Sequence, residues 1–251
     1  MIGNAFRRPR ILGGAAVALG LIAAGPALAQ SLTIGLDEGT GITERALQLI
    51  ALITVLSLAP SILVMVTSFT RIIVVLSLLR TAIGIQQSPP NVVVISLALF
   101  LTAFVMTPVF TDAYKAGIEP LTQNEIEFTE AFDRASRPFH GFMMEHVREK
   151  DLELFVSMAG DDQQVSEPAE IPLQVLVPAF VISELKRAFE IGFLLFVPFI
   201  VIDMVVASVL MSMGMMMLPP IIISLPFKLI FFVLVDGWHL VTGSLVESFA
   251  T

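Results

Sequence analysis

Six charged side chains lie inside the most hydrophobic third of this chain, residues 171–235: Glu184, Lys186, Arg187, Glu190, Asp203 and Lys228. A charge at the centre of a bilayer costs about 2.5–3.5 kcal/mol on insertion scales, so it is seldom left facing lipid. Such residues usually pair with one another or line a water-filled path. The sequence therefore predicts a membrane protein with internal polar contacts. A content of 56% hydrophobic and 14% charged residues agrees, because soluble domains carry about 25% charged residues.

The composition argues against several kinds of site. The chain has no cysteine and only three histidines, so we expect no disulfide, no thiolate metal centre and no cofactor. His140 and His146 are expected at the surface of an acidic segment. A net charge of −8 argues against nucleic acid as a partner. No nucleophile stands near a base, and Ser183–Glu184 lacks a partner histidine, so no catalytic residue and no enzyme is predicted.

Residues 1–29 have the three parts of a secretory signal peptide. Arg7, Arg8 and Arg10 precede an apolar run and an Ala-Leu-Ala cleavage site that ends at Ala29. The apolar run is too short to span a bilayer comfortably, which favours cleavage over an uncleaved first helix. We expect the mature chain to begin with a periplasmic segment, residues 30–45.

The first hydrophobic block, residues 46–110, predicts a membrane hairpin. A first span near residues 46–66, weakened at Pro60, is expected to lead into a second helical stretch. That stretch should end at the Ser88-Pro89-Pro90-Asn91 turn, because adjacent prolines punctuate helices. Residues 92–110 then form a second span of about the right length.

Residues 111–170 change character, because they hold most of the acidic residues of the chain. Apolar residues recur at three- and four-residue steps within residues 124–155, which predicts an amphipathic helix pair. Counting spans from a periplasmic N-terminus places this small polar domain in the periplasm. The same count places residues 67–91 in the cytoplasm.

The second hydrophobic block, residues 171–251, predicts another membrane hairpin. We expect it to divide at Ser183–Glu190 and at a methionine-rich loop, with helices near residues 191–213 and 221–238. Together the segments predict an all-α integral membrane protein of helical hairpins, interrupted by prolines and charges, that carries a small polar helical domain.

Two long motifs resemble the signatures of the FliP family, a flagellar export-gate family. The first is PAFVISELKRAFEIGF, residues 178–193, and the second is PFKLIFFVLVDGW, residues 226–238. Thr67–Arg71, the Pro89–Asn91 turn and Arg137–Pro138 are also similar to that family. The resemblance extends from Ile42 to the C-terminus.

This resemblance implies a function in protein export. FliP-like proteins assemble as a ring, suspected to be a pentamer, which together with FliQ and FliR forms the entry channel of the flagellar type III secretion apparatus. The expected location is the bacterial inner membrane within the flagellar basal body. FlhA and FlhB lie nearby, and unfolded flagellar subunits pass through without bond chemistry. Membership of the related virulence injectisome branch remains an alternative.

A small-solute or ion transporter is a second alternative, because broken helices with charges in mid-span are typical of transporters as well. Such proteins usually show two similar halves. Here residues 46–110 and 171–238 share a hairpin form but not a residue pattern. A purely structural membrane scaffold is the third interpretation.

A methionine cluster precedes the Leu218-Pro219-Pro220 turn. Methionine is unbranched and polarizable, so a ring of its side chains can close a pore and repack around a passing chain. By residues alone, ordinary membrane core or an apolar loop is the favoured interpretation. The resemblance implies that Met215, Met216 and Met217 form a gasket around the pore.

Glu184 and Lys228 are predicted to form a buried ion pair, because each lies in a signature segment and would be costly there without a partner. The alternative is that both side chains snorkel to an interface. Asp203 could face the pore or pair with Arg187, and Lys186 and Arg187 are candidate pore or assembly charges. Trp238 is expected at the membrane boundary beside a tight Asp236–Gly237 turn.

Overall fold

The computed structural model describes residues 42–85, 87–159, 171–215 and 217–250. The predicted signal peptide, residues 1–29, lies outside the described residues. Contacts divide the chain into two units, one through Ser57 and one from Leu58 onward, which are described separately. Helix α2, Ile42–Met65, crosses this division and contains Pro60. In the described part of the chain every regular element is a helix.

The first hydrophobic block continues with two helices that were predicted from the sequence. Helix α3, Phe69–Ile83, ends at Gly84, whose positive φ of 93° suits glycine because a Cβ would be strained there. Helix α4, Asn91–Ala113, begins after the predicted proline turn. A π-helical turn η1, Tyr114–Ile118, and the short helix α5, Glu119–Thr122, extend it.

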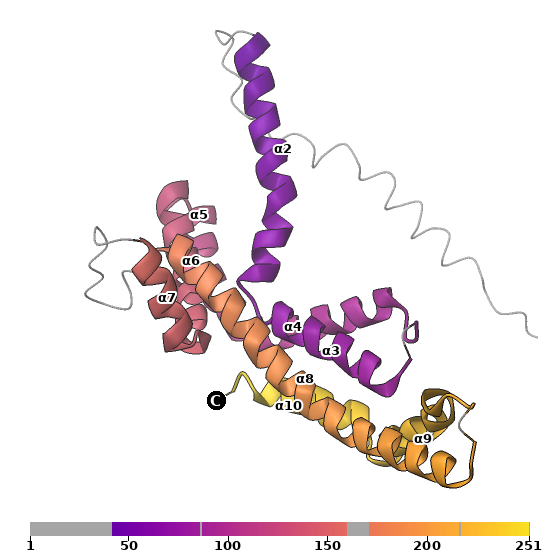
Figure 1. The fold of residues 1–251 in the computed structure, drawn as a ribbon. Helices are drawn as coiled ribbons and strands as arrows, with labels where there is room; N and C mark the ends of the chain where they lie inside the picture. The colour runs from indigo at the N-terminus through magenta and orange to yellow at the C-terminus, as the bar shows by residue number, and fades with distance from the viewer. Residues whose placement is uncertain (1–41, 86, 160–170, 216, 251) are drawn as a thin grey trace, which may run out of the picture. The chain divides into compact units, whose positions relative to one another are not determined.

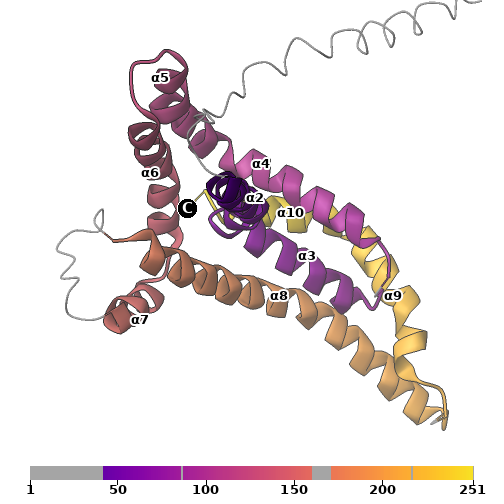
Figure 2. The same cartoon turned by 90° about the horizontal axis from the view of Figure 1, so that it is seen from above.

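The acidic segment contains the expected pair of amphipathic helices. Helix α6 spans Phe128–His146 and helix α7 spans Glu149–Ala159. Figure 2 shows α6 leading away from α5, with α7 at its far end near the start of α8. The periodicity predicted both helices because their apolar side chains recur on one face.

The second block differs from its predicted division. Helix α8 runs without a break over Leu173–Ser212, 40 residues, so the predicted interruption at Ser183–Glu190 is wrong. Helix α9, Pro220–Leu234, ends earlier than expected, and helix α10, Gly237–Glu247, follows after a bend of 63°. The charges of Ser183–Glu190 do not end α8, because Glu184 has a partner on α3, and Lys186 and Glu190 pair one turn apart on α8 itself.

Helix α3 lies at the centre of the packing and contacts α4, α8 and α9. In Figure 1 it runs beside the orange helix α8, and side chains from both helices form part of the core. A Cβ on Gly192 of α8 would lie 2.3 Å from Leu78 Cδ1 of α3. Glycine at this position therefore permits the close approach of the two helices.

Several helices are long and apolar enough to cross a membrane. Within the described residues, the continuous stretches Asn91–Thr122 and Leu173–Ser212 meet this test individually. The broken pairs α2–α3 and α9–α10 meet it when each pair is counted as one span. The structure therefore agrees with the predicted all-α membrane protein.

Candidate functional site

A buried ion pair with two hydrogen bonds joins α3 to α8. Arg71 Nε donates to Glu184 Oε2 at 2.9 Å, and Arg71 Nη2 donates to the other carboxylate oxygen. The side chains are 1% and 0% exposed. This bidentate geometry uses both oxygens of the carboxylate, which makes it one of the stronger forms of charged hydrogen bond.

The C-terminal end of the described chain completes the surroundings of Arg71. Arg71 Nη1 donates to the carbonyl oxygen and to Oγ of Ser248, both at 2.9 Å. The guanidinium also lies 3.7 Å from the centre of the Phe249 ring, within the range of a cation–π contact. Phe249 packs on His146 and Phe142 of α6. One arginine thus connects the helical core with the chain end and, through Phe249, with the polar domain.

His146 was expected at the surface, and the structure corrects this expectation. The residue is buried, and its Nδ1 lies 2.8 Å from the carbonyl oxygen of Phe142. His140 is half-buried, with Nε2 2.9 Å from the Ile171 carbonyl oxygen. The periodicity that predicted α6 also places His146 on the buried face, four residues after Phe142.

A second ion pair joins α8 to α9. Lys228 Nζ lies 2.7 Å from Asp203 Oδ2, and the Ser224 hydroxyl donates to Asp203 Oδ1. Lys228 also donates to the Ala82 carbonyl oxygen of α3 at 3.4 Å. Lys228 is buried, whereas the Asp203 side chain is 32% exposed. Asp203 therefore neutralises the buried lysine while keeping contact with its surroundings.

A third polar network joins α8 to α7. The Ser183 hydroxyl donates to Asp151 Oδ2 at 2.7 Å and accepts from the Arg148 backbone N–H at 3.0 Å. Arg148 Nε and Nη2 bind the two Asp151 oxygens at 2.8 and 2.9 Å. These Arg148 hydrogen bonds lower the pKa of Asp151, with a further contribution from Ser183, although partial burial acts in the opposite direction.

The predicted Glu184–Lys228 pair is wrong within this chain, because each residue has a different partner. Glu184 binds Arg71, and Lys228 binds Asp203. Asp203 therefore does not take Arg187 as its partner. The sequence predicted that Glu184 and Lys228 are buried and paired, and both are buried, but their partners are Arg71 and Asp203. Asp203 had been expected to face the pore or to pair with Arg187.

Lys186 and Arg187 do not join these networks. Lys186 Nζ lies 3.4 Å from Glu190 Oε1 one turn later on α8, and both side chains are about half exposed. Arg187 is half-buried and has no carboxylate within ion-pair distance among the described residues. Their role as assembly or pore charges stays a prediction.

The methionine-rich loop lies at the tip of the α8–α9 hairpin. Met213 is the C-cap residue that follows α8, and Gly214 takes a positive φ of 75° that turns the chain. Met215 is exposed, and Met217 is 98% exposed. Met216, the middle residue of the predicted gasket, lies outside the described residues. The loop thus presents the Met217 side chain almost fully, and the Met215 side chain in part, to the outside of the described chain.

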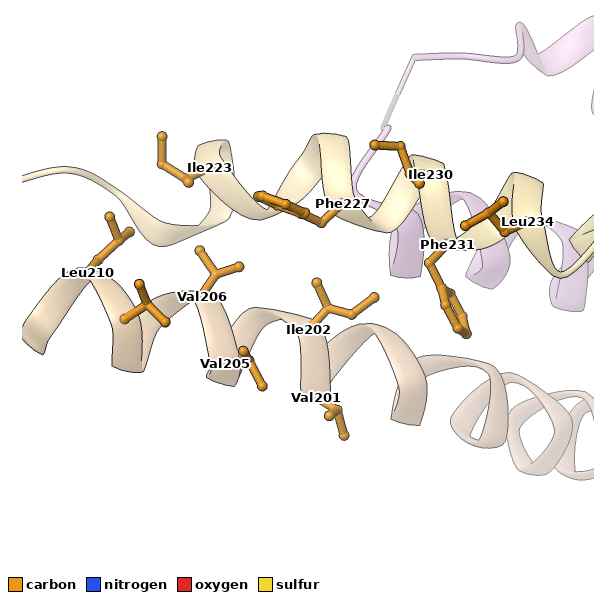
Figure 3. A pocket seen from close by; sticks show the side chains of 11 residues that line it. Val201, Ile202, Val205, Val206, Leu210, Ile223, Phe227, Ile230, Phe231 and Leu234 are labelled. Carbon is orange, nitrogen blue, oxygen red and sulfur yellow. The ribbon is translucent and has the colours of Figure 1, made fainter.

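An apolar groove follows the same hairpin. It has a volume of about 590 Å³ and lies between α8 and α9. Figure 3 shows Ile202 and Val206 of α8 below Ile223 and Phe227 of α9. Its lining consists of valine, leucine, isoleucine and phenylalanine, so this region offers surface to lipid or protein and not to a polar solute.

These features define the class of protein: an all-helical integral membrane protein whose long α8 helix is joined to its neighbours by internal ion pairs. Comparison with known sequences gives the family. The FliP family model matches residues 52–245, which shows that the chain belongs to the FliP family. The family predicted from the two signature motifs is confirmed.

Several relatives match over nearly their whole length. The chain is 64% identical to flagellar biosynthetic protein FliP of Caulobacter vibrioides, over 94% of this chain and 88% of that protein. It is 56% identical to the Bacillus subtilis protein of the same name, over 82% of this chain and 93% of that protein. The Aquifex aeolicus protein is 50% identical, over 91% and 96%. This membership places the chain among proteins of flagellum biosynthesis.

Proposed function

We propose that this chain is the pore-forming subunit of the flagellar type III export gate. Several copies form a ring in the bacterial inner membrane, within the flagellar basal body, and unfolded axial subunits pass through it. FliQ and FliR complete the channel, and FlhA and FlhB act beside it. The observation that carries the proposal is the pair of exposed methionines, Met215 at 43% and Met217 at 98%, at the tip of a long apolar hairpin.

The internal ion pairs support a channel made between subunits. Arg71 and Glu184 neutralise each other inside one chain, and Lys228 and Asp203 do the same. These charges are therefore committed to holding helices together and are not arranged along a path for a solute. A pore for polypeptide then requires surfaces that several copies bring together.

The exposed apolar surface of the second block supports assembly. Phe193 and Leu194 of α8 and Val233 and Leu234 of α9 are all more than 60% exposed. Contiguous apolar surfaces of this kind face lipid or other subunits. A ring that packs these hairpins side by side would gather the methionine loops near one axis.

Methionine side chains at the tip suit a pore that opens for a passing polypeptide and closes again afterwards. An unbranched thioether side chain adapts to varied neighbours more readily than a branched one. A soft apolar ring can exclude water and ions while it is closed. It can also repack around an extended polypeptide without specific contacts to any one sequence.

A leak assay tests this proposal. We expect the triple variant Met215→Ala, Met216→Ala and Met217→Ala, overproduced with its partners, to admit ions or small dyes while appreciable export continues. The matched control replaces Met158 and Met204, which are exposed methionines outside the loop, and should remain sealed.

An assembled triple variant that stays sealed would contradict the gasket. Solute uptake by the purified chain in vesicles without its partners would instead support the transporter alternative. Assembly is checked by purifying the complex of each variant before the leak is measured.

A further inference from the structure

Arg80, on the last turn of α3, differs from the other basic residues of its hairpin. Arg71 has a carboxylate partner, but Arg80 has none within 4 Å among the described residues. Its Nη1 donates to Asn91 Oδ1 and, at 3.4 Å, to the Pro89 carbonyl oxygen. In the described part of the chain, Arg80 Nε and Nη2 make no hydrogen bond, so these two nitrogens can donate to a ligand.

Arg80 stands at a narrow apolar groove formed by three helices. The groove has a volume of about 190 Å³. Leu76 of α3, Val93 and Leu97 of α4 and Trp238 of α10 line it. Val93 and Trp238 are about half exposed, so the groove opens to the outside of the chain. A single positive group at one point of an apolar groove matches a ligand with an anionic head and a hydrocarbon tail.

The position of the groove agrees with such a ligand. Arg80 lies beside the start of α4, a 23-residue helix whose dipole adds partial positive charge. Basic groups that lie between membrane helices bind anionic lipid headgroups. Tryptophan is enriched at membrane–water interfaces, because its ring is apolar and its N–H is polar.

We propose that this groove binds an anionic phospholipid. The open donors of Arg80 hold the phosphate, and the first part of an acyl chain lies along Leu76, Val93, Leu97 and Trp238. The inference concerns one chain and its membrane, and it does not depend on the proposed pore.

Trp238 is the single tryptophan of the sequence, so it reports directly on this groove. The experiment titrates the full chain, purified in detergent, with phosphatidylglycerol that carries brominated acyl chains. Bromine quenches tryptophan fluorescence on contact. We expect quenching at lower concentrations than with brominated phosphatidylcholine, whose headgroup has no net charge.

Two variants separate the headgroup contact from the groove. Arg80→Gln should raise the phosphatidylglycerol concentration for half-quenching by about fivefold and leave phosphatidylcholine unchanged. Val93→Phe keeps the charge but fills the groove from an exposed position, and it should also weaken quenching. Arg187→Gln is the matched control, because Arg187 has no carboxylate partner among the described residues and does not line the groove.

The outcomes are distinct. Equal quenching by the two lipids, or an unchanged titration of an Arg80→Gln protein that keeps its helical circular dichroism, would overturn the proposal. Inorganic phosphate that competes fully with the lipid would show a free-anion site and would also overturn it. If phosphatidylglycerol does not quench Trp238 and the oligomer size changes on dilution, copies of the chain cover the groove. This result would reject the lipid in favour of a second copy.

Discussion

The two ion pairs that hold α8 differ in what surrounds them. Arg71–Glu184 is closed on every side, with both carboxylate oxygens bound and the chain end packed over the guanidinium. Lys228–Asp203 keeps its acidic partner 32% exposed. Removing one partner from the first pair leaves a buried charge that nothing compensates. In the second pair the Asp203 carboxylate is partly exposed, so its surroundings can compensate its charge when Lys228 is removed. We therefore expect that breaking the first pair costs more stability than removing Lys228 from the second.

The largest effect is expected from breaking the closed pair. Arg71→Ala or Glu184→Ala should destabilise the chain by about 3–5 kcal/mol, because an uncompensated charge stays buried. Thermal unfolding of the purified protein in detergent measures the loss. The combined Arg71→Met and Glu184→Met variant should recover part of it, because well-packed apolar residues can replace a buried pair. If Arg71→Ala or Glu184→Ala is as stable as the unmodified chain, the claim that the remaining charge is buried without compensation is wrong.

A smaller effect is expected from the open pair. Lys228→Met should cost roughly 1–3 kcal/mol, because it leaves only the Asp203 carboxylate, which is 32% exposed and partly compensated by its surroundings. The exchange Asp203→Lys with Lys228→Asp should restore some stability. The exchange Glu184→Lys with Lys228→Glu should restore none, because these two residues do not pair. Rescue by the second exchange would favour the pairing first predicted from sequence.

The network at α7 provides a test by pH. Because hydrogen bonds from Arg148 lower the pKa of Asp151 in the folded state, its contribution is present above the unfolded pKa of about 3.9 and is lost as pH falls through the lower folded value. Unfolding temperatures from pH 6 to pH 2.5 should therefore fall more for the unmodified chain than for Asp151→Asn. If the unfolding temperatures of the two proteins fall by the same amount over this pH range, the ionised Asp151 carboxylate does not contribute to stability.

The smallest effect is expected at the surface of α8. Lys186→Ala should change stability by less than about 0.5 kcal/mol, because Lys186 and Glu190 are both about half exposed and such pairs contribute little. The same unfolding measurement applies. A loss as large as that at Lys228 would mean that Lys186 has a partner in an assembled state, which a chemical cross-linking comparison can identify.

Local patterns predicted much of the helical framework. The proline turn before Asn91 and the spacing of apolar residues in α6 and α7 are properties of short segments, so the sequence alone identifies them. The Asp236–Gly237 turn is another such case. Asp236 adopts a positive φ of 49°, and Gly237 packs closely on the Phe232 ring.

Partner choice and helix continuity could not be predicted in the same way. Charges at Ser183–Glu190 indicated a break only because their partners were unknown. Arg71 lies 113 positions before Glu184, and Asp151 lies on a separate helix. Opposite charges in an apolar segment predict that a pair exists, but the packing of distant helices decides which residues meet.

The continuity of α8 has a mechanical consequence. The helix is held at Glu184, and its other end carries the methionine loop, about 44 Å away at 1.5 Å per residue. A tilt of about 5° around Glu184 moves that end by about 4 Å, close to the spacing of about 4.7 Å between neighbouring extended chains. Because the Lys228–Asp203 pair also ties α8 to α9, such a tilt must move the two helices together. If the methionine loops line the proposed pore, this movement would change the aperture by about the width of one extended polypeptide.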